Sequence, residues 1–239
     1  MLRYLCLFVL LFIPPVLGID SSSVLVLAPG VQLRGADISH HQKRIEWDTV
    51  ATHKELDFVF VKATEGGDYT DSLYCYNWEE IHRVGIMRGA YHFFRPFSCG
   101  VDQAAHFLSV TDMQPGDLPP VLDVETLDAA TPDDLRQEVR NWLVTVEQQL
   151  GVRPILYSNQ HFFERYLAAD FAHYPLWIAR YADEEPVLSN GNSWHFWQHT
   201  NEGCIEGISQ KVDLNFYRGT PEMMRNICWN PEPTALMTP

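Results

Sequence analysis

The segment LPPVLDVET, residues 118–126, decides the fold that this sequence predicts. Two prolines precede an apolar, β-branched run, which is typical of a strand that is buried on both faces. Asp123 and Glu125 belong to the same run, and residues at positions i and i+2 of a strand point to the same side. At ~3.3 Å per residue, their Cα atoms are expected roughly 6–7 Å apart. The segment therefore predicts a buried strand that carries two neighbouring carboxylates.

Seven further segments have β-type patterns and make eight candidate strands with residues 119–125. They cover residues 34–39, 57–64, 86–94, 153–159, 175–181, 194–200 and 211–217. Helical patterns follow the first five strands, at residues 45–54, 72–85, 101–111, 131–151 and 159–168. The last three strands are joined by loops rich in Gly, Asn, Asp and Pro. This order predicts an α/β fold: a modified TIM-like barrel of five β/α units followed by three strands without helices.

The longest helical pattern, residues 131–151, has clear start and stop signals. Thr131 can cap the helix, and Pro132 suits its first turn. Gly151 follows the last apolar position and is expected to end the helix.

In barrels of this class, functional side chains lie at the carboxyl ends of the strands. Acidic, aromatic and amide residues occur near these ends: Asp37, Glu65, Tyr91–Arg95, Asp123, Glu125, Tyr157, Tyr181 and Gln198. The sequence thus predicts one acidic cleft lined by aromatic side chains.

Two carboxylates as close as Asp123 and Glu125 cannot both ionise easily in a partly dry cleft. We expect a raised pKa for Glu125 and a pKa at or below the ordinary value for Asp123, which provides the acid and the anion that glycoside hydrolysis requires. Such a pair could also bind a hard cation or form a solvated edge. We expect no metal and no cofactor, and we expect His92 to be a core residue rather than a general base.

Eight short motifs stand in order along residues 34–217. They are GADISHHQ with IEW, FVKATEG, GAYHFFRP, LPPVLDVE, RPILYSN, YPLWIARY, FWQHT and VDLNFY. In this order and spacing the chain resembles glycoside hydrolase family 25, the muramidases also called Chalaropsis-type lysozymes. The resemblance implies a barrel whose last three strands lack helices. It also implies cleavage of the β-1,4 bond between N-acetylmuramic acid and N-acetylglucosamine in peptidoglycan.

The resemblance also implies roles for matching residues. Glu125 corresponds to the general acid, and Asp123 to the carboxylate that orients the substrate acetamido group or stabilises positive charge. The family's other active-site aspartates and its sugar-contacting tyrosines correspond to Asp37, Asp213, Tyr91, Tyr157 and Tyr181. We add Glu65, Trp197 and Gln198 as substrate-binding candidates. The chain departs from the family at His41, Lys43 and His199, which is expected to alter subsite shape and not reaction type.

Two mechanisms remain open at this point. In one, the acetamido oxygen of the substrate attacks the sugar carbon while Asp123 steadies it, as in other enzymes with a D-x-E strand. In the other, Asp37 or Asp213 activates water and the reaction inverts. Two other functions also remain open: a chitinase-like glycosidase and a non-catalytic carbohydrate-binding barrel.

The composition limits the possible partners. The chain of 239 residues has 17 Lys and Arg against 31 Asp and Glu, a formal charge of −14. Nucleic acid is therefore not expected, because phosphate binding needs a basic face. We expect peptidoglycan glycan strands as the partner and a monomeric protein.

The first 18 residues, MLRYLCLFVLLFIPPVLG, have the pattern of a secretory signal peptide, and an uncleaved membrane anchor is the alternative. We therefore expect a secreted or periplasmic protein with no membrane span after signal removal. Residues 33–229 are expected to form one catalytic barrel, and residues 230–239 a loose tail. Four cysteines follow the signal, and their sequence spacing weakly favours the disulfides Cys75–Cys99 and Cys204–Cys228 over free thiols.

Overall fold

The structure, a computed structural model, describes residues 32–189 and 191–231. The predicted signal peptide at residues 1–18 lies outside the described residues, as do residues 232–239 of the predicted tail.

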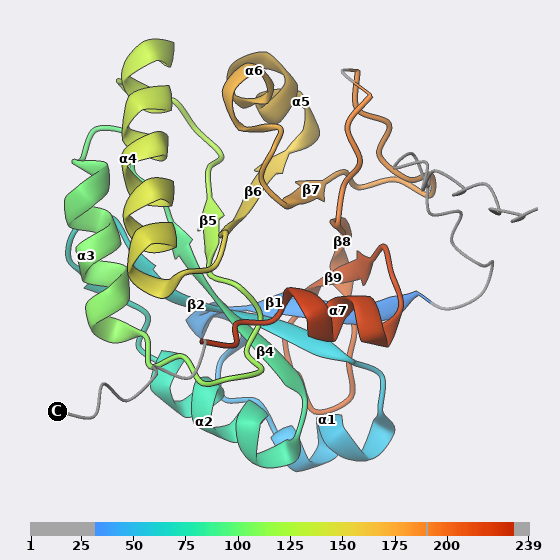
Figure 1. Cartoon of the computed structure of the whole chain (residues 1–239). Helices are drawn as coiled ribbons and strands as arrows, with labels where there is room; N and C mark the ends of the chain where they lie inside the picture. The colour runs from blue at the N-terminus through green and yellow to red at the C-terminus, as the bar shows by residue number, and fades with distance from the viewer. Residues whose placement is uncertain (1–31, 190, 232–239) are drawn as a thin grey trace, which may run out of the picture.

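Eight strands close into a barrel in the order β1-β2-β4-β5-β6-β7-β8-β9, with β9 paired to β1 (Figure 1). Their bounds are Leu33–Ile38, Phe58–Glu65, Met87–Phe93, Val121–Asp123, Ile155–Asn159, Leu176–Ala179, Phe196–Gly203 and Val212–Tyr217. A two-residue strand, β3 (Tyr69–Thr70), pairs only with the end of β2. Neighbouring strands from β1 to β8 run parallel, whereas β9 is antiparallel to both β8 and β1.

Helices follow each of the first five barrel strands, whereas the wall from β7 to β9 has none in the described residues. They are α1 (Trp47–His53), α2 (Tyr74–Val84), α3 (Gly100–Val110) and α4 (Pro132–Leu150), then α5 (Gln160–Phe162) and α6 (Ala168–Phe171). No helix lies between β7 and β9 in the described residues there. The predicted fold class, five β/α units followed by three strands without helices, is therefore confirmed.

The ends of α4 confirm the predicted start and stop signals. The Thr131 side chain accepts a hydrogen bond from the backbone N–H of Asp134, and Pro132 is the first helical residue. Gly151 ends the helix in the left-handed conformation, with a φ of 67°.

Several local features differ from the prediction. The predicted helix at residues 159–168 is divided, because a π-helical turn, η2 (Phe163–Leu167), separates α5 from α6. β5 ends at Asp123, so Glu125 lies just beyond the strand and not within it. A further helix, α7 (Pro221–Ile227), follows β9 where the sequence analysis expects none.

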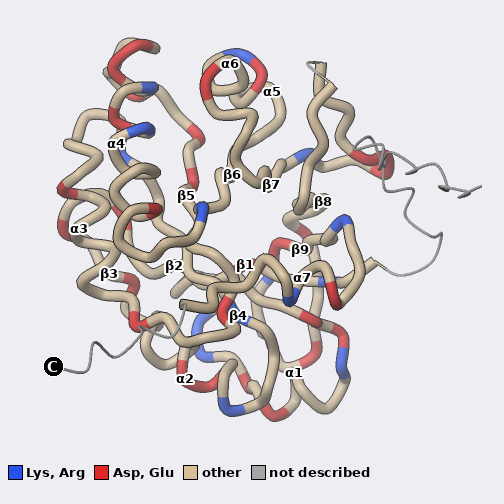
Figure 2. Tube along the Cα trace, viewed as in Figure 1, with Lys and Arg blue, Asp and Glu red and all other residues tan. Residues whose placement is uncertain are grey.

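Acidic residues occur on most of the helices and loops, with Lys and Arg among them (Figure 2). In that view, residues of one sign do not gather in a single part of the fold. The acidic residues are therefore distributed along the described chain and are not confined to one segment.

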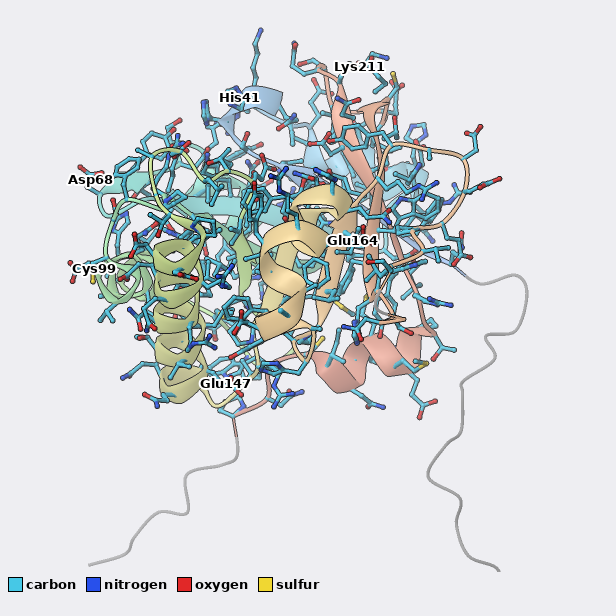
Figure 3. All side chains as sticks on the ribbon, turned by 90° about the horizontal axis from the view of Figure 1, so that it is seen from above. His41, Asp68, Cys99, Glu147, Glu164 and Lys211 are labelled. Carbon is cyan, nitrogen blue, oxygen red and sulfur yellow. The ribbon has the colours of Figure 1, made fainter. Side chains whose placement is uncertain are left out.

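The expected disulfides are not formed: Cys75, Cys99, Cys204 and Cys228 are all free. Cys99 is exposed, as Figure 3 shows, and Cys204 is exposed beside the ammonium of Lys211. Cys228 is instead buried, with its sulfur 3.7 Å from that of Met87. Proximity in the sequence therefore misled the expectation for Cys204 and Cys228, because one thiol is on the surface and the other is enclosed.

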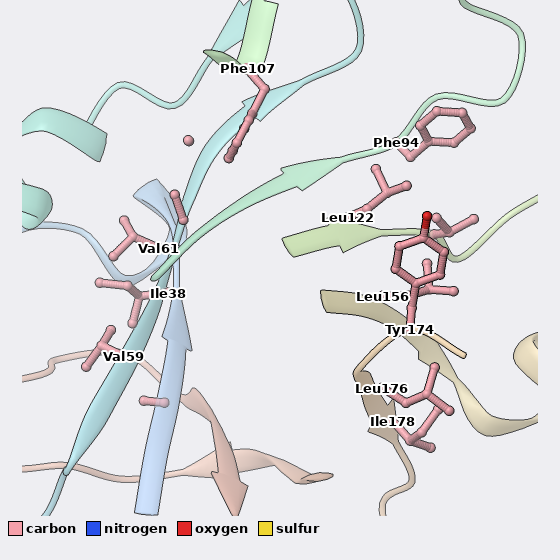
Figure 4. Close-up of a cluster of buried hydrophobic side chains, with 14 of the residues drawn as sticks. Ile38, Val59, Val61, Phe94, Phe107, Leu122, Leu156, Tyr174, Leu176 and Ile178 are labelled. Atoms are coloured by element: carbon pink, nitrogen blue, oxygen red, sulfur yellow. The ribbon is translucent and has the colours of Figure 1, made fainter. Parts of the chain in front are cut away.

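Two apolar clusters hold the barrel. The first lies between the strands and the helices, and Figure 4 shows part of it, including Ile38, Val61, Leu122 and Ile178. The second fills the barrel interior with side chains such as Phe58, Phe60, Trp177 and Phe196. Met224 of α7 belongs to this second cluster, so α7 closes the amino-terminal end of the barrel. Polar side chains line the carboxyl-terminal end of the barrel instead.

Candidate active site

A pocket opens at the carboxyl-terminal end of the parallel strands. Its volume is about 220 Å³, and an adjoining hollow of about 360 Å³ shares Glu125, Tyr157 and Tyr181 with it. The pocket is lined by Asp37, Ser39, His41, Lys62, Tyr91, Phe93, Asp123, Glu125, Tyr157, Trp177, Tyr181, Gln198 and Asp213. All four acids that the sequence analysis selected therefore meet in one place.

The alternation of side chains along each strand explains this convergence. On β1, Leu33 points into the barrel, and Asp37 does so four residues later at the mouth. On β8, Phe196 fills the interior and Gln198 lines the pocket. Inward positions are thus apolar in the depth of the barrel and polar at its open end.

Asp37 and Asp213 form one side of the pocket. They are directly opposed across the β1–β9 ladder, and Asp213 reaches the mouth from the start of its strand only because β9 is antiparallel. Asp37 is almost fully buried and accepts hydrogen bonds from two side-chain amides. Gln198 Nε2 lies 3.0 Å from each carboxylate oxygen, and Asn215 Nδ2 lies 2.7 Å from Oδ1.

A second layer of hydrogen bonds orients these two amides. The hydroxyls of Tyr157 and Tyr181 donate to Gln198 Oε1 at 2.9 and 3.1 Å. Trp177 Nε1 donates to Asn215 Oδ1 at 2.8 Å. Because both amide oxygens accept, both amide nitrogens are turned toward Asp37.

Asp123 and Glu125 form a second acidic pair, on β5 and the residues after it. β5 is three strands from β1 around the barrel in one direction, so the two pairs line different parts of the mouth. Asp123 is almost fully buried, and its Oδ1 atom has no hydrogen-bond partner among the described residues. This carboxyl group therefore retains unused capacity for hydrogen bonding.

Burial raises the pKa of Glu125, as predicted, and the nearby Asp213 adds to that effect. Burial also raises the pKa of Asp123 well above its ordinary value, and Glu125 and Asp37 add to it. The expectation of an ordinary or low pKa for Asp123 is thus wrong. The physical reason is that Asp123 is buried and Glu125 is partly buried, and neither carboxyl group forms a salt bridge with a described residue.

Asp37 and Asp213 follow the same rule. Burial raises the pKa of Asp37 in spite of its two amide donors, and the charge of Asp213 raises it further. Burial also raises the pKa of Asp213. The four acids form one electrostatic unit, since the proximity of one affects the ionisation of the others.

Lys62 is the lysine in the pocket lining, and it lowers the pKa of both Asp123 and Glu125. Its ammonium is 2.6 Å from Glu65 Oε2, and Arg95 pairs with the other oxygen of Glu65. Glu65 does not line the pocket itself. In this structure Glu65 holds Lys62, and its expected contact with substrate stays a prediction.

Trp197 does not line the pocket, and its expected contact with substrate stays a prediction. Its ring is buried in the outer cluster, and its Nε1 donates to the carbonyl of Arg180 at 2.8 Å. The physical reason is the strand alternation, because Gln198 points inward and its neighbour must point outward. Tyr91, Tyr157, Tyr181 and Gln198 do line the pocket.

Trp177 and Asn215 are functional-site residues that the sequence analysis did not select. Trp177 lines the pocket and fixes Asn215, which in turn holds Asp37. The signal was present in the two-residue period: Asn215 stands two positions after Asp213, and Trp177 four positions before Tyr181.

His92 is a fully buried core residue, as predicted. It bonds to Thr64 Oγ1 at 2.7 Å and to Gln103 Oε1 at 3.0 Å, and burial lowers its pKa to about 3. It is therefore unsuited to act as a base in the pocket, from which it points away.

Two features are absent from residues 32–189 and 191–231. No group of three or more His, Cys, Asp or Glu side chains there is arranged to hold a metal ion. No helix in that part of the chain is long and apolar enough to cross a membrane.

The chain is similar to a known enzyme family and to several known proteins. The family model for glycosyl hydrolases family 25 matches residues 36–208. The chain is 40% identical over 197 residues to the uncharacterized protein YegX of Escherichia coli K12, covering 81% of this chain and 72% of YegX. It is 32% identical over 205 residues to lysozyme M1 of Streptomyces globisporus, covering 80% and 69% of the two chains.

A solved structure supports the same assignment. The family 25 glycosyl hydrolase from Bacillus anthracis superposes with a TM-score of 0.75 at 31% identity, covering 81% of this chain and 92% of that one. The family match includes Asp37, Asp123 and Glu125 and ends five residues before Asp213. The chain therefore belongs to glycosyl hydrolase family 25 and is a glycoside hydrolase.

Proposed function

We propose that this protein is a secreted or periplasmic muramidase, which hydrolyses the β-1,4 bond between N-acetylmuramic acid and N-acetylglucosamine in peptidoglycan. The observation that carries the proposal is the meeting of two acid pairs, each with one buried member, in one aromatic-lined pocket. Similarity to lysozyme M1 supports the substrate, and the signal-like pattern of residues 1–18 supports export.

Glu125 acts as the general acid in this proposal. Its raised pKa keeps a proton available in mildly acidic solution, and the proton passes to the glycosidic oxygen as the bond breaks. The adjoining hollow, which shares Glu125 with the pocket, provides room for the leaving sugar.

Asp123 assists the substrate's own acetamido group. Its carboxyl oxygens have hydrogen-bonding capacity for the acetamido N–H, which turns the acetamido oxygen toward the sugar carbon. The positive charge that develops on the sugar ring and the acetamido group favours the ionised form of Asp123. Water then opens the cyclic intermediate, with Glu125 as the base that accepts its proton.

The inverting alternative needs a carboxylate that activates water. Asp37 is poorly suited to it, because amide donors already occupy both of its oxygens. Asp213 is the remaining candidate for that role. Azide added to an Asp213→Asn variant distinguishes the mechanisms: rescue that yields an inverted glycosyl azide would favour the inverting path, and the acetamido route predicts no inverted product.

The first prediction concerns Glu125→Gln. This change removes the transferable proton at nearly constant shape, so the rate should fall on the order of 10²–10⁴-fold or more, with folding and sugar binding retained. The measurement is mass spectrometry of borohydride-reduced digests of purified peptidoglycan, in which muramidase action creates reduced muramic acid ends.

Glu79→Gln, an exposed change on α2 outside this pocket, is the matched control and should be active. New glucosamine ends in place of muramic acid ends would indicate the glucosaminidase or chitinase-like alternative. Sugar binding without turnover by the wild type would indicate a carbohydrate-binding barrel. Substantial activity in folded Glu125→Gln would remove Glu125 from the role of general acid.

A further inference from the structure

The turn after β1 is anchored on several sides. It forms a short 3₁₀ helix, η1 (His40–Gln42), which begins with a capping box. The Ser39 side chain accepts from the backbone N–H of Gln42, and Gln42 Oε1 accepts from the backbone N–H of Ser39 at 2.9 Å. The buried carboxylate of Asp71 accepts from the His40 backbone N–H at 3.0 Å and lies 2.6 Å from His40 Nδ1. Gln42 Nε2 also donates to the carbonyl of Lys211 at 3.1 Å.

His41 belongs to this turn, but its side chain takes no part in anchoring it. Its side chain is exposed, lines the pocket, and has no hydrogen-bond partner for its ring nitrogens among the described residues. Within the described part of the chain, its one aromatic ring contact is with His40, at 4.1 Å between centroids. Figure 3 shows His41 and Lys211 at the same edge of the molecule, in agreement with the Gln42 contact. The turn therefore places the His41 imidazole at the pocket, and no hydrogen bond within the turn involves that ring.

The charge of the pocket limits what such an imidazole can bind. Four acids line the pocket, so a substrate carboxylate that enters it meets repulsion. Lys62 can offset part of this repulsion, but its ammonium is already paired with Glu65 at 2.6 Å. Among the residues that line the pocket, His41 is the other one with a basic side chain, and its ring nitrogens have no hydrogen-bond partner among the described residues.

We infer that His41 is a specificity-determining residue that donates a hydrogen bond to a carboxylate of the substrate beside the cleaved bond. The inference rests on the proposed muramidase function, because N-acetylmuramic acid carries a lactyl carboxyl group. That group is free where the glycan has no stem peptide, and stem peptides carry carboxylates of their own. Either source presents the same chemistry to His41.

Three tetrasaccharides of alternating N-acetylglucosamine and N-acetylmuramic acid distinguish the sources. One has free lactyl carboxylates, one has lactyl methylamides, and one carries stem peptides. The kcat and KM of wild type, His41→Ala and His41→Asn are measured for each at one fixed pH. His53→Ala is the matched control, because His53 is an exposed histidine of α1 outside the pocket.

The wild type should prefer a carboxylate-bearing substrate over the methylamide by about tenfold in kcat/KM, as expected for a hydrogen bond to a charged group. His41→Ala should lose this preference through KM with kcat nearly unchanged, and His41→Asn should retain part of it. A loss confined to the free lactyl substrate identifies the lactyl group as the source. A loss confined to the peptide-bearing substrate identifies the stem peptide.

Equal preference in wild type and His41→Ala, or no preference in the wild type, overturns the inference. Binding to Glu125→Gln and to its His41→Ala double variant, measured by titration calorimetry, provides a readout that does not depend on turnover. If the wild type cleaves none of the three substrates, the proposed function fails. If cleavage persists and only the ratios are unchanged, His41 alone loses its assignment.

Discussion

Asp123 shows how a single residue can oppose the stability of the fold that holds it. Its carboxyl group is buried, one oxygen has no partner among the described residues, and two neighbouring acids raise its pKa further. A raised pKa in the folded state means that the folded protein binds more protons than the unfolded chain between the two pKa values. Stability is therefore lost as pH rises through the folded-state pKa.

The replacement Asp123→Asn should accordingly raise the melting temperature at pH 7 and have little effect near pH 4. Each 1 kcal/mol gained in the free energy of unfolding should raise Tm by about 2–4 °C in a protein of this size. The measurement is a series of thermal melts from pH 4 to 7 on both proteins. Asp68→Asn, an exposed change in the β2–β3 turn, is the control. A Tm difference that shrinks toward neutral pH would contradict the argument.

The two-residue period of a strand decides which site residues the sequence can reveal. It correctly placed Asp37, Asp123, Tyr157 and Gln198 at the pocket, because each stands at the polar end of an inward-facing set. The same rule excludes Trp197, since adjacent residues on β8 cannot both point inward. Burial and pairing were harder to predict, because the raised pKa of Asp123 depends on neighbours from other strands.

At the scale of elements, helical periods and caps were sufficient for α1 to α4 but not for the irregular parts. The π-helical turn inside residues 159–171 shares its apolar spacing with an α-helix. The direction of β9 also leaves no trace in its own pattern of side chains, because parallel and antiparallel strands alternate alike. Only the pairing with β8 and β1 shows that Asp213 comes from the start of a strand.

A buried ion pair joins β4 to the segment that leads into β5. Arg88 Nε donates to Asp117 Oδ1 at 2.8 Å, and Arg88 Nη1 donates to the carbonyl of Trp78 at 2.6 Å. Both side chains of the pair are almost fully buried, and the backbone N–H of Gln114 donates to Asp117 Oδ2. The pair thus fixes the chain a few residues before β5, which carries Asp123.

Arg88→Met should destabilise the fold by about 3–5 kcal/mol, because Asp117 would remain as an unpaired buried charge. Urea unfolding measures the change. The double variant Arg88→Met with Asp117→Leu should recover part of the lost stability, because it also removes the unpaired Asp117 carboxylate. Arg83→Ala, which breaks exposed ion pairs, is the control and should change the midpoint little. A single-variant loss no larger than that of Arg83→Ala would show that the pair contributes little.

At the scale of the whole molecule, the barrel places its chemistry by closing one end and opening the other. α7 and the interior aromatics fill the amino-terminal end, while the antiparallel β9 completes the wall and brings its acid to the open end. The sequence predicted the strand count and the missing helices. It could not predict closure by α7, because a short helix after the last strand resembles any surface helix until its packing is known.

The formal charge of −14 leads to the last prediction, which concerns binding to whole cell walls. Acidic residues are spread along the described chain with Lys and Arg among them (Figure 2), and the negative net charge is expected to repel an anionic wall. Raising the salt concentration toward 0.1 M shortens the screening length to ~10 Å and weakens the repulsion between the two. Hydrolysis of whole walls should therefore increase over this range, while hydrolysis of an uncharged soluble oligosaccharide stays nearly constant. Turbidity clearing of walls and chromatography of the soluble products measure the two rates. A steady decrease in wall hydrolysis with added salt would instead mean that local attraction, and not overall charge, governs the encounter.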